Sequence, residues 1–409
     1  MASEPLHLAV ALDGAGWHPA AWREPGTHPR ELLTPRYWTD LARTAEAGLL
    51  DLVTIEDSLG LQSHSPFQPD DRVDEVRGRL DALLIASFLA PLTSRVGLVP
   101  TVTTTHTEPF HVSKAVATLD HNSHGRAGWQ VKVSGRAEDA AHIGRREITR
   151  PSAEELTAPR LPEALVALFD EAADVVRVVR QLWDSWEDDA EIRDVATRRF
   201  IDRTKVHHVD FEGRFFSVRG PSITPRPPQG QPVVVALAHR REPYELAARG
   251  ADLVFVTPTE QRDAAALLAD VEQAAADVGR TGEPLHVYAD LVVVLDTATE
   301  PGAARLRRLD DVAGEPYTSD TTVFTGSAAE LADLVAAWQA IGYRGVRLRP
   351  AVLPEDLDRI VADVVPELQR RGLFRTVYEA TTLRGLLSLP TSVPNRYAVG
   401  ATGLKGRSR

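Results

Sequence analysis

Residues 95–131 read RVGLVPTVTTTHTEPFHVSKAVATLDHNSHGRAGWQV. The stretch contains a short apolar run rich in β-branched residues, Val96–Val102, which predicts a strand. A longer helical pattern follows at Pro109–Asp120, and a further strand is predicted at Arg126–Val133. Short strands that alternate with longer helices are typical of a parallel α/β fold.

The same alternation continues on both sides of this stretch. The predicted strands are Leu6–Leu12, Asp51–Ile55, Val96–Val102, Arg126–Val133, Pro232–Leu237, Leu253–Val256, Val287–Leu295 and Val346–Leu348. The predicted helices are Pro35–Gly48, Arg79–Ala90, Pro109–Asp120, Pro162–Trp183, one from about Pro243, Glu260–Gly279, Ala328–Ile341 and Pro354–Arg371. Eight such units predict a closed (β/α)8 TIM barrel. A doubly wound open sheet is the alternative, but the loop at residues 13–16, DGAG, lacks the third glycine of its fingerprint.

The chain of 409 residues is longer than a typical domain of about 100–200 residues, but α/β barrels often reach such lengths. We therefore expect a single barrel domain over residues 1–409. Insertions into the barrel are expected at about residues 134–161, 190–230 and 296–325. Glu212-Gly213, between alternating residues, predicts a hairpin inside the second insertion. The tail 385–409 is rich in proline and glycine and is expected to be irregular.

Composition excludes several functions. Fifty-eight Asp and Glu against 46 Lys and Arg give a formal charge of −12, which argues against a nucleic-acid or membrane-surface binder. Cysteine is absent, so disulfides, thiolate metal sites and a cysteine nucleophile are excluded. The start, MASEPLHLAVALDG, lacks a basic leader, and no stretch reaches the roughly 20 apolar residues that span a bilayer. A cytoplasmic protein is expected.

The active site of a (β/α)8 barrel lies at the carboxyl ends of its strands. The polar residues expected there are Glu56, Asp57, Thr103, Thr104, Thr105, His106, Gln130, Lys132, Ser134, His239, Arg240, Arg241, Thr257, Arg347 and Arg349. None of these has the spacing of a metal site, and no nucleophile elbow or P-loop is present, so we expect no metal.

Several of these residues have a structural alternative. Asp57 could cap a helix or pair with a neighbouring cation, and Thr103–Thr105 could be ordinary β-branched strand residues. The pair His239-Arg240 precedes a predicted helix, where charge and free backbone N–H groups suit a phosphate. A solvated turn is the alternative for that pair.

The chain resembles the bacterial luciferase-like flavin monooxygenases, in the branch of nitrilotriacetate, dibenzothiophene-sulfone and pristinamycin-type monooxygenases. The matching stretches are VTIEDS at 53–58, the stretch 95–131 quoted above, QLWDSWEDD at 181–189, VHHVDFEGRFFSVRGP at 206–221, GLFRTVYEATTLRGLLSLP at 372–390 and NRYA at 395–398. They occur in family order over nearly the whole chain. The family fold is a (β/α)8 barrel, in agreement with the strand count.

The resemblance implies a two-component monooxygenase. A separate NAD(P)H:flavin reductase would supply reduced FMN, and this chain would use it with O2 to oxygenate a small organic substrate. A homo-oligomer is also expected. By position, Asp57 matches the acidic residue near the isoalloxazine, and Thr103 matches the hydroxyl residue beneath the ring. Gln130 stands where relatives often have asparagine.

The chain departs from the family at the FMN phosphate. Where many relatives have a glycine–serine–serine turn, it has Ala238-His239-Arg240, and Phe169 and Leu165 stand where a tyrosine and a histidine are common. We predict that His239 and Arg240 replace the missing hydroxyl groups, because charge-assisted bonds to phosphate are the stronger kind.

The remaining expectations concern chemistry beside the ring. His106 is the candidate catalytic residue, as a hydrogen-bond donor or proton shuttle facing the flavin peroxide. Trp17, His18, Trp22 and His64 are candidate substrate contacts, with loop packing as the alternative. Two other functions stay open, a deazaflavin-dependent hydride-transfer oxidoreductase and a non-catalytic flavin-binding barrel.

Overall fold

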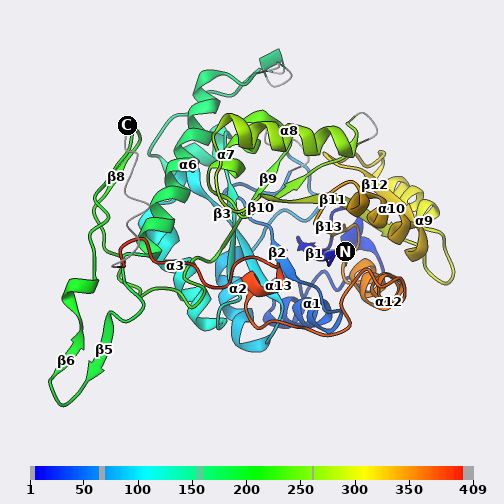
Figure 1. The fold of residues 1–409 in the computed structure, drawn as a ribbon. Helices are drawn as coiled ribbons and strands as arrows, with labels where there is room; N and C mark the ends of the chain where they lie inside the picture. Colours follow the sequence, from blue (N-terminus) through cyan, green and yellow to red (C-terminus); the bar gives the residue numbers. More distant parts are fainter. Residues whose placement is uncertain are drawn as a thin grey trace.

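The computed structural model describes residues 5–63, 70–152, 154–155, 158, 160–259 and 262–398. Its strands form a closed parallel barrel in sequence order (Figure 1). The barrel strands are β1 His7–Leu12, β2 Leu52–Ile55, β3 Gly97–Thr103, β4 Gly128–Lys132, β9 Val233–Ala238, β10 Leu253–Val256, β11 His286–Leu295 and β13 Gly345–Pro350. Pairing of β10 with β11 and of β13 with β1 closes the ring. The predicted TIM barrel is therefore confirmed.

Helices surround this barrel. The main ones are α1 Pro35–Ala47, α2 Ala82–Leu89, α3 Pro109–Asn122, α6 Glu163–Trp183, α7 Arg241–Gly250, α8 Ala264–Asp277, α10 Ala328–Ala340, α11 Glu355–Arg359 and α12 Val365–Arg370, the last two joined by a π-turn at Ile360–Val364. Short 3-10 turns occur at Ala21–Arg23, Ala90–Leu92, Thr104–His106 and Arg203–Lys205.

Helix boundaries follow local capping. The Thr34 hydroxyl accepts the Tyr37 N–H at the start of α1, and Pro35 occupies the first turn, as predicted. The second helix begins later than predicted, because Asp81 accepts the Leu84 N–H and so places the start at Ala82. These differences move boundaries but leave the order of elements unchanged.

The predicted insertions contain more regular structure than expected. The first holds the short helix α4, Ala137–Ile143. The second holds two hairpins, β5 Glu191–Asp194 with β6 Arg199–Ile201, and β7 Phe211–Glu212 with β8 Ser217–Val218; the latter is the predicted hairpin. In Figure 1 the β5–β6 hairpin projects away from the barrel. The third holds helix α9, Gly302–Ala313, and strand β12, Val323–Gly326, which adds to β11 outside the barrel.

The tail is more ordered than predicted up to residue 398, and residues 399–409 lie outside the described part. Helix α13, Leu383–Leu386, covers the amino end of the barrel. Leu383 packs over the starts of β3 and β4, where a Cβ at Gly97 would lie 2.4 Å from its Cδ1 and one at Gly128 3.2 Å from its Cδ2. Glycine at both strand starts makes this close packing possible. The opposite, carboxyl end of the barrel is the end that carries polar residues.

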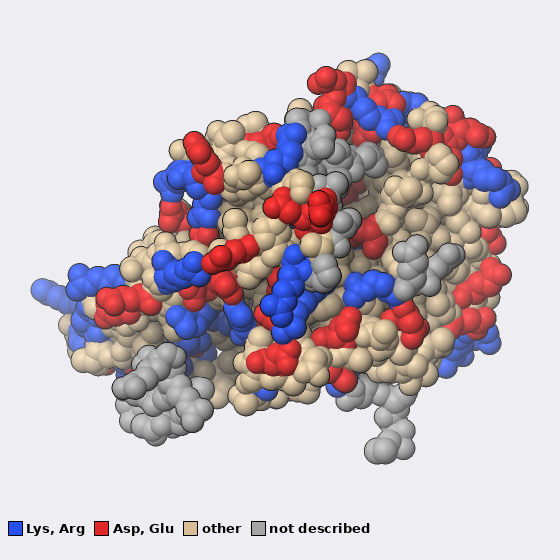
Figure 2. Space-filling view, turned by 90° about the horizontal axis from the view of Figure 1, so that it is seen from above, with Lys and Arg blue, Asp and Glu red and all other residues tan. Residues whose placement is uncertain are grey.

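The surface has no single sign of charge on the face shown in Figure 2, where acidic and basic side chains intermix. No helix in the described part of the chain combines the length and the apolar character needed to cross a bilayer.

Candidate active site

Gln130 lies at the centre of a buried polar network inside the barrel. Its Nε2 donates to Thr101 Oγ1 (3.0 Å) and Glu56 Oε1 (3.1 Å), and its Oε1 accepts from Arg347 Nη1 (2.9 Å). Arg347 also holds Asp290 through Nε and Nη2, at 3.0 and 2.7 Å. The predicted cofactor residue Gln130 is thus fixed in orientation by side chains from three other strands or strand ends.

The network continues toward the barrel mouth through Arg349. This guanidinium contacts Asp290 and donates from Nη1 to Asp320 Oδ1 at 2.6 Å. Burial by itself raises the pKa of Asp320, but Arg349, followed by His239, holds that pKa well below its usual range. His239 adjoins the same carboxylate, with Nε2 3.5 Å from Asp320 Oδ2 and Nδ1 3.0 Å from Thr257 Oγ1.

Asp57, Thr103 and Lys132 come together at the carboxyl ends of β2, β3 and β4. The Lys132 ammonium donates to the backbone carbonyl of Asp57 at 2.5 Å. Thr103 is the register partner of Lys132, and among the described residues its hydroxyl has no hydrogen-bond partner. The strand pattern predicts Lys132 at this strand end but assigns it no role. Lys132 follows Gln130 by two residues, and residues two apart face the same side of a strand. This spacing indicates that Lys132 faces the same site as Gln130.

The Asp57 carboxylate serves the fold directly. Its Oδ1 accepts the Ser58 N–H (2.6 Å) and its Oδ2 accepts the Ala82 N–H at the start of α2 (2.9 Å). Burial raises the pKa of Asp57, against the lowering effect of those two N–H groups. The helix-capping alternative is therefore realised, and a contact with a ligand would be an additional role.

His106 lies in the 3-10 turn after β3, within a small cavity of about 150 Å³. Its Nε2 is buried and has no partner among the described residues. Burial, and then the charge of Arg146, lowers the pKa of His106 and so favours the neutral ring. The cavity is also lined by Glu171 of α6 and by Phe215 of the β7–β8 hairpin, and not by Gln130.

His239 and Arg240 are neighbours in the chain but contact different groups. Arg240 Nε pairs with Glu242 Oε2 at 3.0 Å, and Arg240 Nη2 donates to the Ala158 carbonyl at 3.0 Å. Glu242 in turn accepts the Leu161 N–H, so Arg240 faces the first insertion, whereas His239 faces Asp320.

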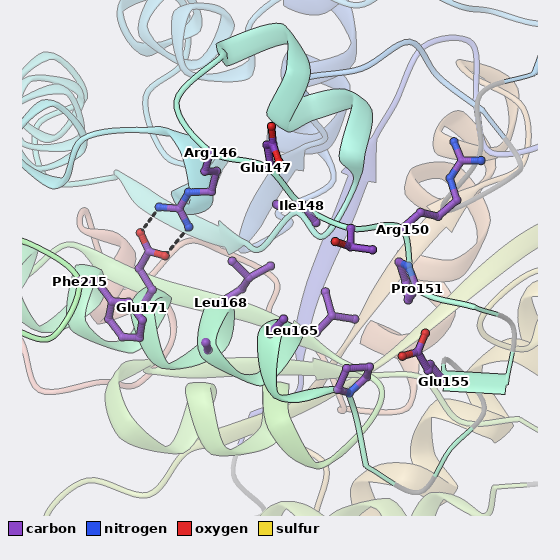
Figure 3. Close-up of a pocket in the computed structure, with 14 residues that line it drawn as sticks. Arg146, Glu147, Ile148, Arg150, Pro151, Glu155, Leu165, Leu168, Glu171 and Phe215 are labelled. Atoms are coloured by element: carbon purple, nitrogen blue, oxygen red, sulfur yellow. Dashed lines mark hydrogen bonds and ion pairs between the residues drawn. The ribbon is translucent and has the colours of Figure 1, made fainter.

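A cavity of about 370 Å³ separates the first insertion from α6 (Figure 3). Leu165 and Leu168 of α6 and Ile148 of the insertion give it apolar walls. At one end Arg146 and Glu171 form a bidentate ion pair, with both contacts at 2.6 Å. Leu165, where the family resemblance predicts a histidine in relatives, belongs to this apolar wall.

A second cavity of about 430 Å³ opens at the barrel mouth. Three of the four predicted substrate residues, Trp17, His18 and Trp22, line it together with Tyr317 and Arg349. His18 is held by Asp310 through Nε2 at 3.1 Å and accepts the Ala20 N–H at Nδ1. His64 lies outside the described residues.

The chain is a (β/α)8 barrel with buried charged groups at the carboxyl ends of its strands, beside a cavity of small-molecule size. These features are typical of TIM-barrel enzymes. The family model described as "Luciferase-like monooxygenase" matches residues 17–322. The chain belongs to the luciferase-like monooxygenase family. This membership confirms the predicted class of enzyme, a flavin-dependent monooxygenase.

Individual relatives cover nearly the whole chain. The N-acetyl-S-(2-succino)cysteine monooxygenase of Bacillus subtilis is 30% identical over 96% of this chain and 98% of its own length. Nitrilotriacetate monooxygenase component A of Aminobacter aminovorans is 31% identical over 95% and 97%. Among solved structures, a riboflavin lyase with modified FMN and riboflavin superposes with a TM-score of 0.79, at 24% identity, over 98% of this chain and 99% of that chain.

Proposed function

We propose that this chain is the oxygenase component of a two-component system, which binds reduced FMN and uses O2 to oxygenate a small organic substrate. The observation that carries the proposal is the convergence of Asp57, Thr103, Gln130 and Lys132 at the carboxyl ends of three neighbouring strands. The riboflavin lyase, which was crystallised with modified FMN, supports a flavin as the cofactor.

The residues present fit an isoalloxazine ring. Its pyrimidine edge carries two carbonyl oxygens, which need hydrogen-bond donors. Thr103 supplies a hydroxyl without a partner among the described residues, and the Lys132 ammonium has three donors of which Asp57 O takes one. When bound, reduced flavin supplies the electrons that activate O2.

The chain's own residues would hold that ring, exclude water and position the substrate. Gln130 cannot swing freely, because Glu56, Thr101 and Arg347 fix both ends of its amide. The aromatic walls of the 430 Å³ cavity, Trp17 and Tyr317 among them, would exclude water from the reacting atoms. We assign the substrate to this cavity.

Two further roles belong to the proposal. His239 and Arg240 would bind the FMN phosphate, with Arg240 exchanging part of its contact to Glu242 for the ligand. His106, whose neutral form burial favours, would donate a hydrogen bond from its ring N–H toward the reacting oxygen.

The reductase would be a separate protein. The name of the nitrilotriacetate relative, component A, supports a system of more than one protein. Purified protein with NADH and FMN should consume no oxygen, and addition of an unrelated flavin reductase should start consumption that depends on substrate. Substantial NADH oxidation by the protein alone would contradict a two-component system.

Titration with flavins tests which cofactor the protein binds. Under anaerobic conditions, reduced FMN should quench the tryptophan fluorescence of the protein saturably, and a deazaflavin should not. Tight deazaflavin binding would favour hydride transfer, and absence of any flavin binding would favour a non-catalytic barrel.

A further inference from the structure

Lys132 lies where the predicted flavin contacts meet. It ends β4, faces the same side of that strand as Gln130, and pairs in register with Thr103 of β3. Its Nζ reaches the backbone carbonyl of Asp57 at 2.5 Å. The ammonium therefore contacts the backbone of Asp57, and Lys132 shares a register position with Thr103 and a strand face with Gln130, the other two residues for which the family resemblance predicts contact with the ring.

The positive charge of Lys132 is not neutralised by an ion pair. Within the described part of the chain, no carboxylate oxygen lies within ion-pair distance of its Nζ, and its hydrogen-bond partner is a neutral carbonyl. The nearest acids have other partners. Glu56 contacts Arg347 Nη1 at 3.1 Å, and Asp13 contacts Arg79 Nη2 at 3.2 Å.

This arrangement is costly in the absence of an anion. Lys132 is partly buried, and a buried charge without an ion-pair partner loses hydration that a neutral carbonyl does not replace. Burial lowers the pKa of Lys132, while Glu56, and more weakly Asp13 and Asp57, raise it; Arg79 acts in the same direction as burial. An anionic ligand placed against the ammonium would recover the lost stabilisation.

We propose that Lys132 contacts the flavin and makes this site prefer reduced FMN, whose ring loses a proton to become an anion, over oxidised FMN, whose ring is neutral. The inference rests on the proposed function and deepens it. Both forms of FMN carry the same phosphate, so phosphate contacts cannot distinguish them. A charge beside the ring can, and an oxygenase supplied by a separate reductase must bind the reduced form and release the oxidised one.

The test compares dissociation constants for reduced and oxidised FMN, measured anaerobically by fluorescence titration of the full-length protein. Lys132→Met and Lys132→Gln should weaken reduced FMN by about tenfold or more, since they remove a unit charge at contact distance from an anion. Oxidised FMN should bind about as before. Lys132→Arg, which keeps the charge, should retain most of the preference.

Lys205→Gln is the matched control, because Lys205 pairs with Asp189 on the second insertion, away from the barrel strands. It should leave both constants unchanged. The midpoint potential of bound FMN gives an independent readout, and it should become more negative in Lys132→Met. Folding of each variant is checked by circular dichroism.

Equal weakening of both FMN forms, or no change in either, would overturn the role of Lys132 while leaving the proposed function intact. Failure of the unmodified protein to bind either form would overturn both. The two failures are therefore distinguishable.

Discussion

Asp290 and Arg347 are register partners on the adjacent strands β11 and β13, and their side chains form a bidentate ion pair inside the barrel. Both are fully buried, at 0% and 1% exposure. The third nitrogen of the guanidinium, Nη1, donates to Gln130 and to Glu56. One ion pair in the barrel interior therefore orients residues that reach the candidate flavin site.

Arg347→Met should destabilise the fold strongly. It removes the cation that pairs with Glu56 and with Asp290 and the donor to Gln130 Oε1, and breaking a buried pair in this way costs about 3–5 kcal/mol. Urea denaturation gives the change in the free energy of unfolding. Arg359→Met, which breaks an exposed pair with Asp363, is the control and should change it by less than about 1 kcal/mol. A loss at Arg347 as small as the control's would contradict a supporting role for the network.

Substitution of Asp57 should separate its two roles. Asp57→Ala removes the acceptors for the Ser58 and Ala82 N–H groups and should destabilise the protein by about 0.5–2 kcal/mol, the value of a helix cap. Asp57→Asn keeps one acceptor oxygen and should cost less. Both variants preserve the backbone carbonyl that Lys132 contacts, and both should weaken reduced FMN. Unchanged affinity per folded molecule in both would show that Asp57 is structural.

Phosphate recognition is tested by two adjacent arginines. Arg240→Ala should weaken FMN about tenfold or more, as expected for one charge-assisted phosphate contact of roughly 1.5–3 kcal/mol, and should hardly affect riboflavin, which has no phosphate. Arg241→Ala is the matched control, because Arg241 is exposed and pairs with Glu245 and Asp277. Equal losses for FMN and riboflavin, or none for either, would exclude Arg240 as a phosphate ligand.

The free energy of unfolding should increase between about pH 4 and pH 6.5, because folding lowers the pKa of His286. Burial, and then the charge of His7, lowers the pKa of His286 to about 4, against about 6.5 in the unfolded chain. Between these values the unfolded state binds more protons, so the free energy of unfolding increases with pH by up to about 3 kcal/mol.

The measurement for His286 compares urea midpoints at several pH values across that window. His286→Gln should lack this part of the rise, and His142→Gln, at an exposed position on α4, should keep it. Parallel pH profiles for wild type and His286→Gln would contradict the assignment.

Sequence patterns alone predict the eight barrel strands in their order and most of the helices between them, and the family stretches add the class of enzyme. These features are local: the β-branched run of β9 and the proline-started helix α1 are set by neighbours in the chain. Helix α9 was missed because its polar composition, with Arg305 and Asp310, hides an apolar face that only packing against β11 reveals.

Which polar and charged side chains contact one another follows from the folded barrel and could not be predicted from the sequence. Gln130 and Arg347 are 217 residues apart, and closure of the barrel brings their side chains within 2.9 Å. Likewise, Arg240 pairs with Glu242, and Lys132 donates a hydrogen bond to the backbone carbonyl of Asp57. No sequence pattern within a strand or loop predicts either contact. Contacts between strand ends depend on strand register and on the paths of the loops, and packing of the whole barrel fixes both.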